Sequence, residues 1–188
     1  MGRPGVSSRR IAYAGVFIAL TVALGYALMV IPNLEMITAT VFIAGWLMGP
    51  GMGALIGLLS ETIYSGLHPL GSGFLFPPLL IAQVATIALV GFIGGLARKG
   101  EIFFLANAGG YFGLALVGTM LTLIYDIATS LAYPLAAGFE GVQLWATLIA
   151  GLGLGGVHLI SNAVIFFLIV PNILKAVHSQ LGITGVIR

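Results

Sequence analysis

The chain alternates apolar runs with short polar or glycine- and proline-containing breaks, and six such runs lie approximately at residues 11–31, 36–48, 52–66, 79–97, 103–134 and 143–170. A helix needs roughly 20 apolar residues to cross the hydrocarbon core of a bilayer. The pattern therefore predicts an all-α integral membrane protein: six transmembrane helices in one bundle, with residues 1–188 forming a single membrane domain.

The second and third runs are short for full crossings and are separated by Gly49-Pro50-Gly51, a combination that ends a helix. They could be two short helices or a re-entrant hairpin. We favour two short helices, because Glu35 and His68 then both lie on the outer side and the later topology closes.

Basic residues fix the orientation of membrane helices, because they are retained on the cytoplasmic side. Under the six-span arrangement all of the following fall on one side: Arg9, Arg10, Arg98, Lys99, Lys175 and Arg188. Both termini are therefore predicted to be cytoplasmic.

The composition agrees with a membrane protein, since 60% of the residues are hydrophobic and 6% are charged. The mean hydropathy of +1.16 excludes an ordinary soluble globule. The chain has no cysteine and a formal net charge of +2, so no thiolate metal site is possible and no nucleic-acid partner is expected.

Motifs for catalysis are missing: there is no H-E-x-x-H, no G-x-S-x-G and no G-x-x-x-x-G-K-[ST]. The glycine-rich stretch at residues 151–156 lies within an apolar run, without the strand and helix of a dinucleotide site. We expect no enzyme activity, no cofactor and no metal. Any energised transport would need an ion gradient or a separate ATPase.

Small residues recur every four positions in the first run, at Gly15, Ala19, Ala23 and Ala27. This spacing places them in one row on a helix, where another backbone can approach closely. The row is predicted to be a docking face, for a neighbouring helix or for a partner. Similar pairs later in the chain are better explained by packing within the bundle: Gly53 and Gly57, Gly91 and Gly95, Gly109 and Gly113, and Gly151 and Gly155.

Ionisable side chains inside a membrane are costly and point to function. Glu61 and Asp126 are expected at similar depth in the outer half, His158 near the middle of the last span, and Glu35 in the loop above them. Polar and aromatic neighbours would complete a pocket that opens to the outside: Thr38, Thr40, Tyr64, Ser65, Gln83, Thr122, Tyr125, Thr129, Tyr133 and Trp145. Structural pairing of the ionisable groups, or an interfacial role for Tyr133 and Trp145, is the alternative.

The chain resembles the substrate-binding S components of energy-coupling factor (ECF) vitamin transporters over nearly its whole length. The resemblance rests on the size, the six spans with both ends inside, and the basic N-terminus before an A-x-x-x-A helix at Ala19 and Ala23. It also rests on the break at Gly49-Pro50-Gly51 and on the stretches SETIYSGLHPLGSG (60–73) and FPPLLIAQ (76–83).

This resemblance implies a multi-pass protein of the prokaryotic plasma membrane that binds a vitamin-like molecule from outside. It also implies docking, through Gly15, Ala19 and Ala23, onto a transmembrane scaffold subunit with two ATPase subunits. The residues implied in substrate binding are Glu35, Glu61, Tyr64, His68, Gln83, Tyr125, Asp126 and His158.

Two acidic groups with a histidine favour a ligand that is cationic or rich in hydrogen-bond donors. The rival function is a self-sufficient proton-coupled carrier or channel, in which Glu61, Asp126 and His158 relay protons. That function predicts polar groups through the cytoplasmic half, where the sequence offers mainly Thr86, Asn107 and Asn162.

Overall fold

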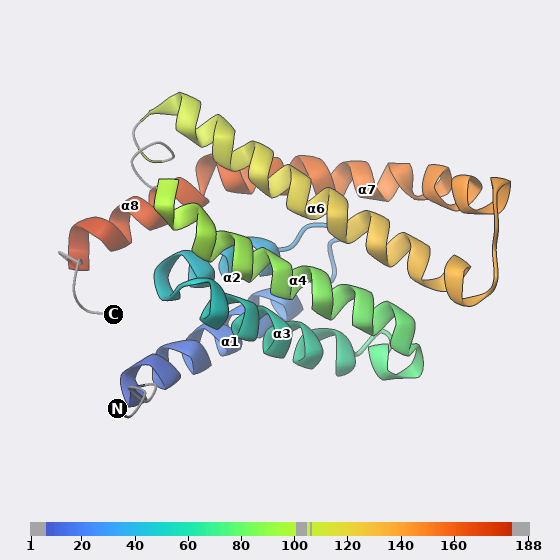
Figure 1. The fold of residues 1–188 in the computed structure, drawn as a ribbon, viewed down its shortest axis with the longest axis horizontal. Helices are drawn as coiled ribbons and strands as arrows, with labels where there is room; N and C mark the ends of the chain where they lie inside the picture. Colours follow the sequence, from blue (N-terminus) through green and yellow to red (C-terminus); the bar gives the residue numbers. More distant parts are fainter. Residues whose placement is uncertain (1–6, 101–104, 106, 182–188) are drawn as a thin grey trace, which may run out of the picture.

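The computed structural model describes residues 7–100, 105 and 107–181, which form helices with short connections and no strand (Figure 1). The helices are α1 (Ser8–Leu28), α2 (Ile37–Met48), α3 (Pro50–Gly66), α4 (Pro77–Ala97), α6 (Ala108–Ala136), α7 (Val142–Leu168) and α8 (Val170–Leu181), with 3₁₀ turns η1 (Gly73–Leu75) and η2 (Arg98–Gly100). The all-helical prediction is confirmed for this part of the chain. The start predicted at residue 103 for the fifth span, and Arg188, lie outside the described residues.

Four helical segments in the described part of the chain are long and apolar enough to cross a membrane: Ser8–Leu28, Pro77–Gly100, Ala108–Ala136 and Val142–Val177. The second predicted run is a shorter apolar helix, α2, of 12 residues. α3 has 17 residues, so it extends about 26 Å at the usual rise of an α-helix. A multi-pass membrane protein follows, with α2 and α3 as two separate helices joined at Gly49.

The helix bounds follow from local chemistry. The Oγ of Ser7 accepts a hydrogen bond from the backbone N–H of Arg10 at 3.4 Å, and the Oδ1 of Asn107 accepts one from Gly110 at 3.2 Å. These side chains cap α1 and α6, whose first N–H groups have no partner within the helix. At the other end of the chain α7 ends at Leu168, close to the predicted end of the last run at residue 170, and a further helix, α8, follows. The residue next to that predicted end is Pro171. It lies in the first turn of α8, where proline's missing N–H costs no hydrogen bond.

Glycines hold α2, α3 and α4 close together. A Cβ atom on Gly53 would overlap the carbonyl of Gly91, and one on Gly57 would overlap that of Ile87. Gly45 of α2 meets the same Gly91 carbonyl. The packing role predicted for the first two glycine pairs is thus visible here, since small residues allow backbones to touch.

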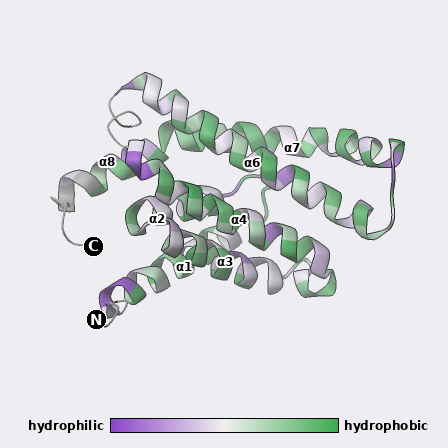
Figure 2. Ribbon diagram, in the orientation of Figure 1, coloured by the Kyte–Doolittle hydropathy of each residue, from purple (hydrophilic) through white to green (hydrophobic). Residues whose placement is uncertain are grey.

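The remaining helices extend this layer, since α4 packs against α6 and α6 against α7 (Figure 1). Large apolar side chains such as Phe112, Leu116 and Leu152 are exposed along α6 and α7, as contact with lipid tails requires. Figure 2 shows long hydrophobic stretches on α4, α6 and α7, and hydrophilic segments at the beginning of α1 and the end of α4.

Candidate functional site

A cavity of about 480 Å³ lies among the loop at residues 29–36 and helices α2, α3, α4, α6 and α7. Five of these segments contribute polar or ionisable side chains. The lining residues that matter below are Asn33, Glu35, Thr38, Glu61, Tyr64, Tyr125, Asp126, Thr129, Ser130 and His158. The cavity has the size and mixed lining of a small-molecule site.

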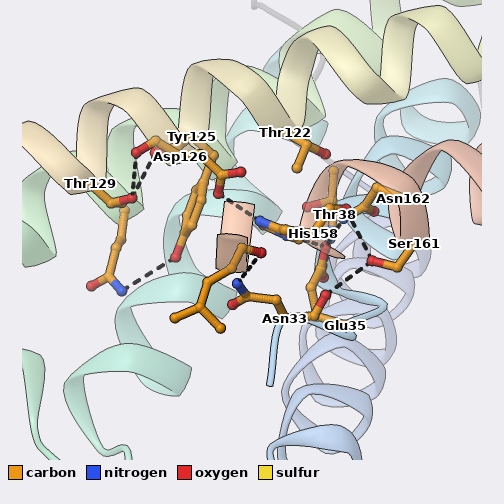
Figure 3. Close-up of polar contacts among 12 residues, drawn as sticks. Asn33, Glu35, Thr38, Thr122, Tyr125, Asp126, Thr129, His158, Ser161 and Asn162 are labelled. Atoms are coloured by element: carbon orange, nitrogen blue, oxygen red, sulfur yellow. Dashed lines mark hydrogen bonds and ion pairs between the residues drawn. The ribbon is translucent and has the colours of Figure 1, made fainter. Parts of the chain in front are cut away.

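His158 is the centre of the polar network (Figure 3). Its Nδ1 lies 2.7 Å from the Oδ1 of Asp126 on α6, and its Nε2 lies 3.5 Å from the Oε1 of Glu35 in the loop. The antiparallel pairing of α6 and α7 brings Asp126 and His158 together. One imidazole therefore connects two carboxyl groups from opposite sides of the cavity.

The beginning of α2 holds Glu35. Its Oε2 accepts a hydrogen bond from the backbone N–H of Thr38 at 2.9 Å, and its Oε1 accepts one from Asn162 at 2.9 Å. An anionic side chain is favoured at the positive end of a helix. Burial by itself raises the pKa of Glu35, but the hydrogen bonds from His158, Asn162 and Thr38 outweigh burial and lower the pKa below its ordinary value.

Asn33 fastens the same loop to α7 at two points. Its amide nitrogen donates to the carbonyl of Leu154 at 2.6 Å, and its own carbonyl accepts a hydrogen bond from the Oγ of Ser161 at 3.0 Å. Together with the Glu35 contacts, these bonds hold the loop across the cavity.

Glu61 enters the cavity from α3 and is 1% exposed. Its Oε1 accepts a hydrogen bond from the Oγ of Ser65, one turn along the helix, at 2.6 Å. Across the cavity, the hydroxyl of Tyr125 accepts a hydrogen bond from Gln83 at 3.3 Å. The Tyr125 ring meets the His158 ring edge-on, with centroids 5.8 Å apart.

The structure thus brings six of the predicted site residues to one cavity: Glu35, Glu61, Tyr64, Tyr125, Asp126 and His158. Gln83 lies behind Tyr125 instead of in the lining. His68 is also outside the lining, where its ring packs against Tyr64 with centroids 5.1 Å apart.

Sequence reasoning did not assign Asn33, Ser161 or Asn162 to the site. It placed Asn162 only among the polar groups of the cytoplasmic half, whereas the Nδ2 of Asn162 donates to Glu35 in the loop at 2.9 Å. The only signal in the sequence was the spacing of Asn162 four residues after His158, which places both on one helical face.

No group of three or more metal-binding side chains occurs in the residues that the structure describes. Ile37 and Ile87 of the cavity lining belong to a cluster of buried apolar residues that also includes Phe42, Leu114 and Phe166. The rings of Phe42 and Phe166 meet edge-on at 5.1 Å. The site is therefore a polar chamber that borders the apolar core.

These features belong to a polytopic helical membrane protein with an internal site for a small molecule. More particularly, the chain belongs to the family of ECF transporter substrate-specific components, whose model matches residues 9–181. No curated protein and no solved structure matches it. The resemblance seen in the sequence is confirmed, and the chain is a substrate-specific subunit of an ECF transporter, a class of transport subunits and not of enzymes.

Proposed function

We propose that this chain binds a vitamin or related micronutrient with high affinity in the cavity around His158, and delivers it to an importer energised by separate ATPase subunits in a prokaryotic plasma membrane. The observation that carries this proposal is the loop at residues 29–36, which Asn33 and Glu35 fasten to α7 over the cavity. A loop that is held in place as part of the cavity wall slows the escape of a bound molecule, as tight binding requires.

The exposed row on α1 supports docking to the scaffold subunit. Gly15, Ala19, Ala23 and Ala27 are all exposed, and nothing lies within 4 Å of a Cβ placed on Gly15. The other side of α1 carries the buried residues Ala14, Thr21 and Gly25. The row is therefore free for another backbone to approach.

A self-sufficient proton-coupled carrier receives less support. Its relay would have to continue from His158 toward the end of the bundle that carries Arg98. The apolar cluster around Phe42 and Phe166 occupies that route, and Phe166 is fully buried. Protons do not move through a packed apolar layer without polar groups or water.

Docking is tested by substituting leucine at Ala19 and Ala23 and co-purifying each variant with a scaffold subunit and its ATPases. We expect recovery of the complex to fall about tenfold or more for each variant, because a bulky side chain keeps the two backbones apart and overpacking costs about 1–3 kcal/mol at a site. Ligand binding should be unchanged, since the row does not line the cavity.

Ala85→Leu is the matched control, because Ala85 is exposed on α4 between the exposed Ile81 and Leu89. It should assemble normally. Normal assembly of the α1 variants would disprove the docking face, and transport by the isolated chain in liposomes without ATP would disprove the importer.

A further inference from the structure

The ionisable lining of the cavity is unbalanced in charge. Apart from two tyrosine hydroxyls, it consists of three carboxyl groups and one imidazole: Glu35, Glu61, Asp126 and His158. Among the described residues, neither lysine nor arginine lines this space. The nearest balancing group is therefore His158 itself.

His158 neutralises at most one of the carboxylates. When its ring is protonated, both nitrogens donate, one toward Asp126 at 2.7 Å and one toward Glu35 at 3.5 Å. Two negative charges then share one positive charge, which leaves a net charge of about −1 before Glu61 is counted. The cavity thus stays negative even where Glu61 is neutral.

Glu61 adds an acceptor that the protein does not use. It is 1% exposed, it lines the cavity, and its only hydrogen-bond partner among the described residues is Ser65, on Oε1. Asp126 is in a similar position, because its Oδ2 is buried without a partner and lies 3.5 Å from a Cβ placed on Gly155 of the cavity wall. Buried carboxylate oxygens without donors are expensive, and a ligand that donates to them removes the cost.

Aromatic rings line the same space. Tyr64 comes from α3 and Tyr125 from α6, and both rings are fixed by neighbours, Tyr64 by Tyr26 at 5.2 Å and Tyr125 by His158 at 5.8 Å. The faces of such rings attract cations, most strongly where water is excluded. The remaining lining includes Ile37, Ile87 and Leu154, which suit an apolar ligand body.

Resting on the function proposed above, we infer that the substrate is an organic cation: a positively charged nitrogen bonded or stacked near Glu61 and Tyr64, attached to a compact apolar body. Anionic molecules are excluded by the uncompensated carboxylates, because a like charge in a low-dielectric site is repelled strongly. A neutral molecule would leave the cavity's negative charge unbalanced.

The test is affinity selection with the whole chain in lipid nanodiscs. The protein is incubated with a deproteinised small-molecule extract of the expression host, supplemented with thiamine and choline as cations, riboflavin as a neutral compound, and biotin and pantothenate as anions. Retained compounds are identified by mass spectrometry. We expect enrichment of cations, and roughly 10- to 100-fold weaker retention by Glu61→Gln, since the amide loses one charged hydrogen bond.

Glu140→Gln is the matched control, because Glu140 is exposed in the α6–α7 connection and outside the cavity; it should retain ligand normally. Tyr64→Leu provides a second variant should Glu61→Gln fail to fold, and it should also weaken retention of the cation. Retained anions or neutral compounds would overturn this inference and leave the proposed function intact. If both cavity variants retained cations as strongly as the wild type, the placement of the charged nitrogen near Glu61 and Tyr64 would be overturned. No enriched compound at all would overturn both proposals.

Discussion

Asn33 adopts a backbone conformation that most residues avoid, with φ 57°. Asparagine and glycine tolerate this left-handed region better than other residues. The turn it creates directs its amide toward the Leu154 carbonyl and its carbonyl toward Ser161. A single residue therefore sets both the path of the loop at residues 29–36 and its attachment to α7.

Replacing Asn33 should accelerate ligand release. Asn33→Gly keeps the backbone conformation and removes only the side-chain bond to Leu154, whereas Asn33→Ala also introduces a strain of about 1 kcal/mol. We expect both variants to lose bound ligand several-fold faster than the wild type, and the alanine variant, which adds the backbone strain, to melt at the lower temperature of the two. Dilution-induced ligand release and thermal unfolding measure the two effects.

If Asn33→Gly released ligand at the wild-type rate, its bond to Leu154 would not hold the loop closed. The backbone bond from Ser161 would then be the attachment to test, and Ser161→Ala removes it without touching the cavity lining.

At the residue scale, the sequence identified the ionisable side chains of the site but not the residues that they contact. Glu61, Asp126 and His158 stood out because an ionisable side chain in an apolar run needs a reason. The bond from Asn162 to Glu35 joins residues 127 positions apart, and no local pattern indicates such a pair. The same limit explains why Gln83 and His68 were predicted in the site but lie outside the cavity lining: the sequence indicated their depth but not the direction of their side chains.

At the scale of elements, the contact of α3 with α4 depends on the absence of side chains. Gly53 and Gly91 face each other so closely that a Cβ on either would overlap the carbonyl of the other. Lipid tails are as apolar as leucine, so packing, and not the exclusion of water, must hold these helices together.

Gly53→Ala should therefore destabilise the protein, while Gly51→Ala on the same helix should not. A Cβ on Gly51 meets nothing within 4 Å. We expect the Gly53 variant to lose about 1–3 kcal/mol, the usual cost of overpacking, and the Gly51 variant to match the wild type or gain slightly from alanine's helix propensity. Thermal unfolding in one detergent compares them, and equal melting temperatures would contradict the tight contact.

The apolar runs predicted where helices lie but not α8. The last run was predicted to end at residue 170, just before Pro171, and proline both ends one helix and suits the first turn of the next. The two roles have the same sequence signal. Here burial of Val170 and Leu174 against the core decides between them, which is a tertiary effect.

At the scale of the whole molecule, the basic residues meet at one end of the bundle. Arg10 of α1 donates to the carbonyl of Met48 at 2.8 Å, and Arg98 donates to that of Leu47 at 3.3 Å. Both arginines thus satisfy carbonyls at the end of α2, where a helix favours positive charge. The α2–α3 turn therefore reaches the level of Arg10 and Arg98.

The position of the two arginines favours six membrane crossings with a cytoplasmic N-terminus, and not an α2–α3 hairpin that ends within the membrane. Because the chain has no cysteine, single cysteines can be introduced to test this topology. Gly51→Cys places a thiol at the exposed α2–α3 turn, and Leu70→Cys places one in the exposed α3–α4 connection. In intact cells, a membrane-impermeant maleimide should label Cys at position 70 and leave position 51 unlabelled until the membrane is opened, because basic residues are retained inside. If the α2–α3 turn reaches the cytoplasm, position 51 in inverted vesicles or permeabilised cells should react as fast as position 70 reacts in intact cells. A thiol at position 51 that reacts from neither side would instead mean that the α2–α3 hairpin ends within the membrane, and labelling of position 51 from outside would reverse the orientation.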